Sequence, residues 1–139
     1  MLLALALAAA SPSVEAKALS ATIPKPAIVL LWADWCAPCR EEVRALPMLS
    51  ASVAPVPVII VAVDANARAR ALLTRVVPAQ KRFWPGSTTA LLRHWSIEAT
   101  GLPFAIALDA SGRACATATG GATPAKLRGL LDECAQPNR

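Results

Sequence analysis

The chain has 139 residues, of which 55% are hydrophobic and 17% charged, so it is one domain and not an intrinsically disordered chain. No apolar run reaches the roughly 18 residues of a membrane-spanning helix, which excludes a polytopic membrane protein. The net charge of +5 permits weak association with an anionic membrane surface, whereas the basic residues are too scattered to indicate nucleic-acid binding.

The N-terminal segment has the pattern of an export signal. Residues 2–10 form an apolar run of Leu and Ala, and Val14 and Ala16 fit the small-residue rule for signal-peptidase cleavage. No Lys or Arg precedes the run, so a disordered Ala-rich leader is the alternative. We expect residues 1–16 to be such a signal peptide or leader and residues 17–139 to form the domain. Export to the periplasm or beyond would place the cysteines in an oxidising compartment.

Two buried strands joined by a helix are predicted next. The continuous apolar runs at 27–33 and 58–63 are typical of strands that are buried on both faces of a sheet. Between them, an apolar stripe at near-helical spacing predicts a helix over residues 36–46, which Pro47 should kink or end. A strand, a helix and a strand over this length form a right-handed parallel unit.

The remaining chain predicts a helix-rich segment, a hairpin and a last helix. The expected elements are a helix at 65–77, a loop at 83–86, a short helix ending at Trp95, strands at 104–108 and about 113–119, and a helix beginning at Pro124. Residues 109–112 have hairpin-turn chemistry, so the last two strands are antiparallel. The whole pattern predicts an α/β domain with a central mixed sheet flanked by helices.

Two cysteines, Cys36 and Cys39, stand at the start of the first expected helix of the domain. Residues three apart share a helix face, and their Cα separation of roughly 5–6 Å suits a disulfide. Backbone N–H groups without an intrahelical partner stabilise a thiolate at Cys36, while Cys39 lies one turn further in. We therefore expect Cys36 to attack a disulfide and Cys39 to resolve the mixed disulfide.

A CxxC pair can also have roles other than disulfide exchange. The pair could be half of a zinc knuckle, but Cys115 and Cys134 are not spaced like a second half, and His94 is the only histidine. A module that handles a soft ion such as Cu(I) through Cys36 and Cys39 is the main alternative, and a redox-inert interaction domain is a second. Stoichiometric, reversible oxidation of the pair would distinguish the three.

The segment LWADWCAPCR, residues 31–40, resembles the active-site segment of thioredoxin-fold proteins, and Gly101-Leu102-Pro103 before a strand resembles the second signature of that fold. The arrangement is most similar to the exported TlpA/ResA-like disulfide reductases and covers about residues 27–131. It implies a thioredoxin fold and thiol–disulfide exchange on protein substrates, with a redox partner protein. It also implies that Trp35 flanks the site and that Pro103 is cis and faces the pair.

Further expectations concern the surroundings of the pair. Because the dithiol carries the electrons, we expect no metal and no organic cofactor. Separately, we expect the chain to be a monomer. The backbone of Leu102 would form a short edge that pairs with an extended substrate peptide. Arg40 can lower the pKa of Cys36 or be a plain surface charge. Thioredoxins carry a buried acid where this chain has Leu30; the nearest replacements in the sequence are Asp34 and Glu98, both expected on the surface.

Cys115 and Cys134 are candidates for a structural disulfide. The last expected strand runs roughly 13 Å onward from Cys115, and the last expected helix runs roughly 15 Å back to Cys134. The two cysteines are therefore expected at a similar height in the domain. Strand alternation argues the other way, because Cys115 shares a face with Thr117 while the neighbouring alanines form the more apolar face. Two separate buried thiols are therefore the alternative.

Overall fold

The computed structural model describes residues 8–98 and 101–136, and within them a five-stranded mixed sheet forms the centre of the domain. The strand order is β3-β2-β1-β4-β5, in which β1, β2 and β3 are parallel and β4 is antiparallel to both β1 and β5. The bounds are β1 Ala27–Trp32, β2 Val58–Val63, β3 Lys81–Trp84, β4 Phe104–Leu108 and β5 Ala114–Thr119. The sheet that the sequence predicts is confirmed.

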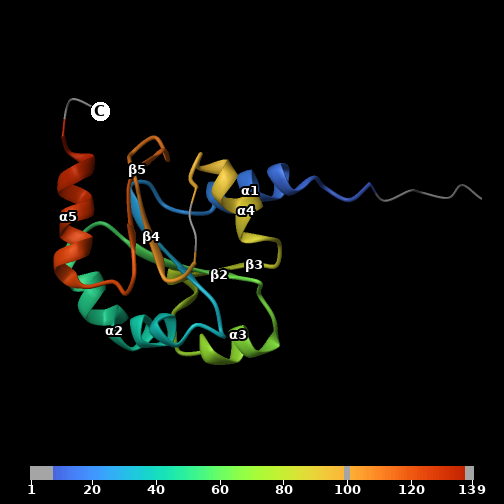
Figure 1. The fold of residues 1–139 in the computed structure, drawn as a ribbon, viewed down its shortest axis with the longest axis horizontal. Helices are drawn as coiled ribbons and strands as arrows, with labels where there is room; N and C mark the ends of the chain where they lie inside the picture. Colours follow the sequence, from blue (N-terminus) through green and yellow to red (C-terminus); the bar gives the residue numbers. More distant parts are fainter. Residues whose placement is uncertain (1–7, 99–100, 137–139) are drawn as a thin grey trace, which may run out of the picture.

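Helices cover both faces of this sheet. Their bounds are α1 Pro12–Ala21, α2 Ala37–Val53, α3 Ala67–Leu72, α4 Thr88–His94 and α5 Pro124–Cys134, with a 3₁₀ turn η1 at Pro78–Gln80. Figure 1 shows α2 and α5 on one side of the sheet and α1 beside α4 on the other, and both helix pairs are in contact. Every residue of β1, β2 and β4 is buried, so these three strands form the middle of the core.

Of the two effects expected at Pro47, a kink or an end of the helix, the structure excludes the end, since α2 continues to Val53. Pro47 is exposed, so water can reach the carbonyl group that lacks a helical partner. Phe83 and Trp84 lie in an edge strand and not in a loop, since β3 pairs in parallel with β2 from Ile60 to Val63. A four-residue strand that begins with two basic residues has too little apolar pattern to be recognised from sequence alone.

The helix expected at residues 65–77 is shorter in the structure. It spans Ala67–Leu72, and the Asn66 side chain caps its start by accepting a hydrogen bond from the Ala69 N–H at 2.9 Å. Residues 73–77 continue as turns before η1.

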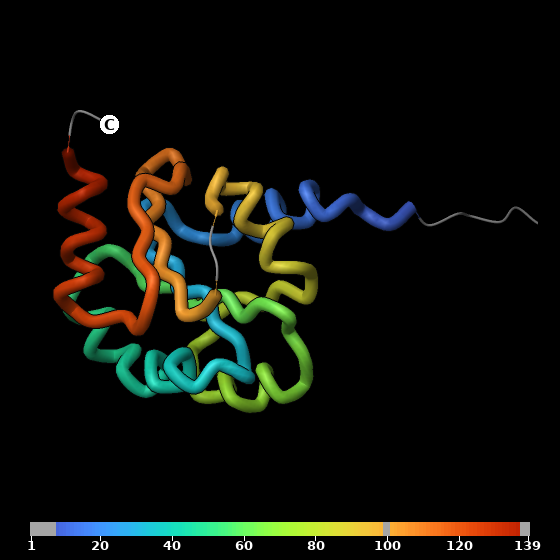
Figure 2. The backbone as a smooth tube through the Cα atoms, in the orientation of Figure 1, coloured from blue at the N-terminus to red at the C-terminus, as the bar shows by residue number. Residues whose placement is uncertain are grey.

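The N-terminal part of the described chain is a helix, α1. Ser11 caps it and Pro12 occupies its first turn, while Ala16 is fully buried and α1 packs against α4 (Figure 2). The expected boundary at residue 16 therefore falls within a packed helix, and residues 1–7 of the expected leader lie outside the described residues. Among the helices of residues 8–98 and 101–136, none combines the length and the apolar composition needed to cross a bilayer.

Candidate active site

Cys36 and Cys39 form a disulfide at the start of α2, directly after the loop that follows β1. Cys36 is the N-cap residue, and its Sγ accepts a hydrogen bond from the backbone N–H of Cys39 at 3.2 Å. Their Cα atoms are 5.2 Å apart, within the range expected from the sequence. Cys36 is 4% exposed and Cys39 is fully buried, so Cys36 is the sulfur that solvent and substrates reach more easily.

The N-cap position has a direct chemical consequence. When the disulfide is reduced, the N–H that now points at the Cys36 sulfur is placed to stabilise a negative charge on it. Cys39 has no such N-cap position, because it lies within the first helical turn and inside the core. The two thiols therefore differ in both charge stabilisation and access.

Pro103 and Leu102 lie at the same end of the sheet as the disulfide. The antiparallel register pairs Leu31 with Phe104, which puts Pro103 beside Trp32, just before the loop that leads to Cys36. The Leu102–Pro103 peptide bond is cis, as the resemblance implies. Leu102 and the 61% exposed Trp35 line a hollow of about 190 Å³. Thr88, Thr89 and Leu92 also line this hollow, and Trp35 precedes Cys36 directly in the chain.

Asp34 is not the surface residue that the sequence predicts. It is 7% exposed, and its carboxylate accepts a hydrogen bond from Asn66 Nδ2 at 3.2 Å and lies 3.9 Å from Arg68 Nε. Arg40 is fixed to the same residue, since its guanidinium donates to the Asp34 carbonyl oxygen at 2.8 Å. Hydrogen bonds to both the carboxylate and the carbonyl oxygen of Asp34 therefore fix the loop before Cys36. Glu98 is exposed, as expected.

Glu42 is the buried acid near the disulfide, and the sequence reasoning missed it. It is 5% exposed, and burial raises its pKa to about 7, although a hydrogen bond with the backbone of Ala122 and the charge of Lys126 oppose the shift. Glu42 stands three residues after Cys39, so both occupy one face of α2. The signal was present in the helical period: the buried residues of α2 are Cys39, Glu42, Leu46, Leu49 and Val53.

We expect Glu42 to make stability depend on pH. Its folded pKa lies near 7 and its unfolded pKa near 4.5, so between these values folding takes up a proton and stability falls as pH rises. This pKa difference lowers the free energy of unfolding by about 3 kcal/mol above pH 7 and does not lower it below pH 4.5. Glu42→Gln should therefore be more stable than the unmodified chain at pH 8 and similar to it at pH 4, as measured by urea unfolding.

The neighbouring exposed acid provides the control. Glu41→Gln removes a carboxylate that forms an ion pair with Arg44 on the helix surface, so it should leave the slope of stability against pH nearly unchanged. Equal slopes for the Glu42→Gln variant and the unmodified chain would contradict the assignment of Glu42 as the buried titrating group.

Cys115 and Cys134 also form a disulfide, which joins β5 to the end of α5 with Cα atoms 5.2 Å apart. A β-bulge resolves the objection from strand alternation. Ala116 pairs with Ala107 and Ala114 pairs with Leu108, so Cys115 is an extra residue in β5. A bulge redirects the side chain of the extra residue, and strict alternation no longer applies there.

All four cysteines are therefore paired. Within the described part of the chain, no three His, Cys, Asp or Glu side chains gather in a way that could hold a metal ion. The Cu(I) alternative thus gains no support from the surroundings of Cys36 and Cys39.

Comparison with known proteins shows the fold. A secreted thiol-disulfide isomerase from Corynebacterium glutamicum is 24% identical, with a TM-score of 0.63 over 85% of this chain and 75% of that one. A DsbF homologue from Corynebacterium diphtheriae is 24% identical, with a TM-score of 0.62 over 82% and 74%. A secreted Mycobacterium tuberculosis disulfide oxidoreductase, described as homologous to Escherichia coli DsbE, is 15% identical, with a TM-score of 0.58 over 81% and 84%.

No family model and no curated protein sequence matches the chain. At these identities the structural likeness establishes the fold, and this chain has the thioredoxin fold, as the sequence resemblance implies.

Proposed function

We propose that this chain catalyses thiol–disulfide exchange on protein substrates through Cys36 and Cys39, as an exported disulfide reductase. The observation that carries the proposal is the disulfide at the N-terminus of α2, in which the Cys39 N–H donates to the Cys36 sulfur. Structures with the same fold are described as thiol-disulfide isomerases and disulfide oxidoreductases, which supports the same chemistry here.

In the reductive direction the exchange has two steps. The Cys36 thiolate attacks one sulfur of a substrate disulfide, forming a Cys36–substrate bond and releasing the other substrate sulfur, which takes up a proton. Cys39 then loses its proton and attacks Cys36, which releases the second substrate thiol. The chain ends with the Cys36–Cys39 disulfide, and a partner dithiol restores the reduced pair while becoming a disulfide itself.

Glu42 is suited to the proton step at Cys39. Cys39 is fully buried, so its proton needs an acceptor inside the protein, and Glu42 is a buried carboxyl on the same face of α2. A pKa of about 7 lets this carboxyl accept and return a proton near neutral pH. Glu42 takes the place of the acid that is missing from β1, where Leu30 stands.

Substrate binding would use the hollow that Trp35 and Leu102 line. Trp35→Ala removes an aromatic side chain that is 61% exposed, so we expect little change in folding stability. We expect KM for a disulfide-bonded protein substrate to rise about tenfold, because an aromatic contact of about 1.4 kcal/mol is lost, with kcat within about twofold. Steady-state kinetics test this.

Met48→Ala is the matched control for Trp35→Ala. Met48 is a similarly exposed hydrophobic residue of α2 that does not line the hollow, so its replacement should leave KM unchanged. Equal effects of the two variants would contradict a substrate role for the hollow.

Export rests on three supporting observations. The apolar run at residues 2–10 has the composition of a signal segment, and relatives of the same fold are described as secreted. The Cys115–Cys134 disulfide suits an oxidising compartment. Cell fractionation, with N-terminal sequencing of the mature chain, tests export. The monomeric state and the weak membrane association remain predictions.

The function itself is tested by the reduction of a disulfide-bonded protein such as insulin by a small dithiol. The unmodified chain should accelerate the reaction, and the double variant Cys36→Ser/Cys39→Ser should not. No acceleration by a folded, unmodified chain would overturn the proposal.

A further inference from the structure

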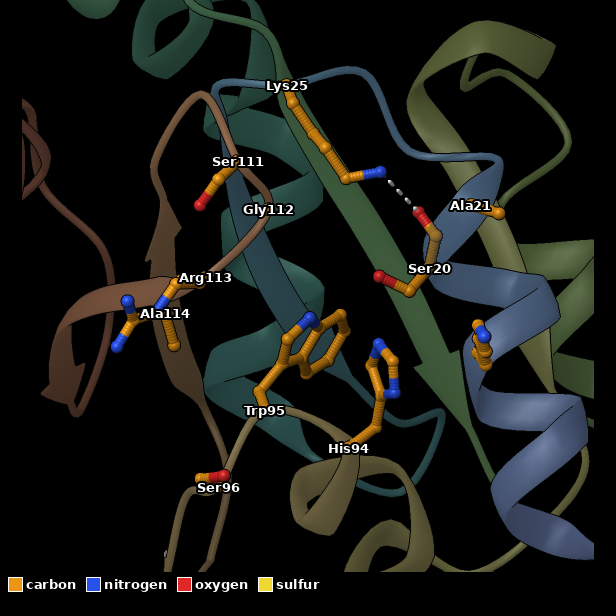
Figure 3. Close-up of a pocket in the computed structure, with 11 residues that line it drawn as sticks. Ser20, Ala21, Lys25, His94, Trp95, Ser96, Ser111, Gly112, Arg113 and Ala114 are labelled. Carbon is orange, nitrogen blue, oxygen red and sulfur yellow. Dashed lines mark hydrogen bonds between the residues drawn. The ribbon is translucent and has the colours of Figure 1, made fainter.

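A cavity of about 500 Å³ lies at the other end of the sheet from Cys36. Cys36 follows the end of β1 where Leu31 pairs with Phe104, whereas the cavity borders Lys25 before β1 and the hairpin turn after β4, at the end where Ala27 pairs with Leu108. Figure 3 shows the last turn of α1, the end of α4 and the β4–β5 hairpin around it. The active-site chemistry described above uses none of its lining residues.

The side chain of Trp95 lines this cavity, and its covered indole N–H is an unused hydrogen-bond donor. The residue is 6% exposed, and its indole N–H has no acceptor among the described residues. In Figure 3 the indole nitrogen lies on the side of the ring that faces Ser20 and Lys25. The hydroxyl of Ser20, a residue that is 5% exposed, points into the same space. A buried donor without an acceptor costs about 1–3 kcal/mol, so an acceptor that enters here is favoured.

The charge of the lining is positive. Lys17 and Lys25 line the cavity, and no Asp or Glu of the described chain does. The Lys25 ammonium donates one hydrogen bond to the Ser20 carbonyl oxygen at 3.5 Å, and its other protons can be donated to a ligand. Burial lowers the pKa of His94, and the charges of Lys17 and Lys25 lower it further, so the imidazole beside the cavity is neutral near neutral pH.

The turn between β4 and β5 forms another wall of the cavity, and its acidic residue, Asp109, does not line it. Gly112 has a φ of +85°, and a Cβ atom there would collide with the Lys25 side chain, so glycine lets Lys25 lie against the turn. The Asp109 carboxylate is committed within the turn, where it accepts hydrogen bonds from Ser111 and from the Arg113 N–H. Figure 3 shows the Arg113 side chain directed away from the cavity.

We propose that this cavity binds a small molecule with an oxyanion group, a phosphate or a carboxylate. The Ser20 hydroxyl donates to its oxygens and the Lys25 ammonium neutralises its charge, and a small rotation of the Trp95 ring brings the covered indole N–H to the same anion. The volume falls within the roughly 300–1,000 Å³ of small-molecule sites and leaves room for an organic part beyond the anion. The site is separate from the thiol chemistry.

Titrations followed by NMR of the full oxidised chain test the proposal, with inorganic phosphate, glycerol 3-phosphate and succinate as probes and sodium chloride at matched ionic strength as the reference. We expect at least one probe to shift the Trp95 indole N–H resonance and the Gly112 amide at millimolar concentration. A shift with both phosphates alone assigns a phosphate ligand, and a shift with succinate alone assigns a carboxylate; either result supports the site.

Paired variants separate the site from general surface charge. Lys25→Gln and Trp95→Phe should each weaken binding about tenfold, since each removes a hydrogen bond to an anion. Arg128→Gln removes the same charge from an exposed position on α5, and Trp32→Phe removes the other buried indole N–H without an acceptor among the described residues; both should bind like the unmodified chain.

Lys17→Gln, at an exposed position that lines the cavity, serves if a buried variant does not fold, and it should also weaken binding because it removes a positive charge from the lining. The proposal is overturned if no probe shifts the Trp95 indole resonance more than chloride does, or if Arg128→Gln weakens binding as much as Lys25→Gln. Disulfide exchange by Lys25→Gln should equal that of the unmodified chain, so the result here is independent of the proposed function.

Discussion

Replacing Cys36 with serine is expected to abolish disulfide exchange, whereas replacing Cys39 should stop the reaction one step later. Without Cys36 no nucleophile remains at the N-cap, where the Cys39 N–H stabilises a thiolate. In Cys39→Ser, Cys36 can still attack, but the mixed disulfide has no second thiol to resolve it. Non-reducing electrophoresis should show a covalent chain–substrate adduct for Cys39→Ser and none for Cys36→Ser.

The variant that accumulates the mixed disulfide identifies which cysteine attacks the substrate. Cys36 is the more exposed thiol and Cys39 is fully buried, so the reverse pattern would require the core to open before attack. An adduct that accumulates with Cys36→Ser and not with Cys39→Ser would mean that the roles are exchanged. Cys115→Ala/Cys134→Ala, with the active pair intact, should turn over substrate without accumulating an adduct.

Removing the second disulfide is expected to have the largest effect on stability. Cys115–Cys134 joins residues 19 positions apart, and in the chain-entropy model closing a loop of this size stabilises the fold by about 3 kcal/mol. We therefore expect the free energy of unfolding of Cys115→Ala/Cys134→Ala, measured by urea titration, to be lower by about that amount, while insulin reduction by the folded variant is retained.

Cys36→Ser/Cys39→Ser is the matched comparison, since it also removes one disulfide but opens a loop of only three positions. Its loss of stability should be smaller, because the entropy of loop closure grows with loop length. A larger loss from the Cys36–Cys39 pair than from Cys115–Cys134 would contradict the structural role of the latter.

The pairing of Cys36 with Cys39 could be predicted from sequence because its determinants are local. The apolar run of β1, the cysteine spacing and Pro38 in the first turn together fix a helix start with Cys36 at its cap. The hairpin of β4 and β5 was predictable for a similar reason, since residues 109–112 carry their own turn chemistry.

The features that sequence reasoning missed depend on contacts between distant segments. Glu42 is buried in the region where α2 packs against α5, and it is hydrogen-bonded to the backbone of Ala122, which is far from it in the sequence. Asp34 is buried and accepts a hydrogen bond from Asn66, 32 positions away. The bulge at Cys115 is a change of register between two strands, and alternation within one strand cannot predict it.

A redox titration of the full chain, with each cysteine assigned by alkylation and peptide mapping, tests the central claim most directly. We predict that Cys36–Cys39 converts between disulfide and dithiol in one reversible two-electron step, at a potential within about −270 to −120 mV, while Cys115–Cys134 stays oxidised. A value toward the negative end would support the reductase direction. If the Cys36–Cys39 pair does not change reversibly anywhere in this range, the chain does not perform thiol–disulfide exchange at this site.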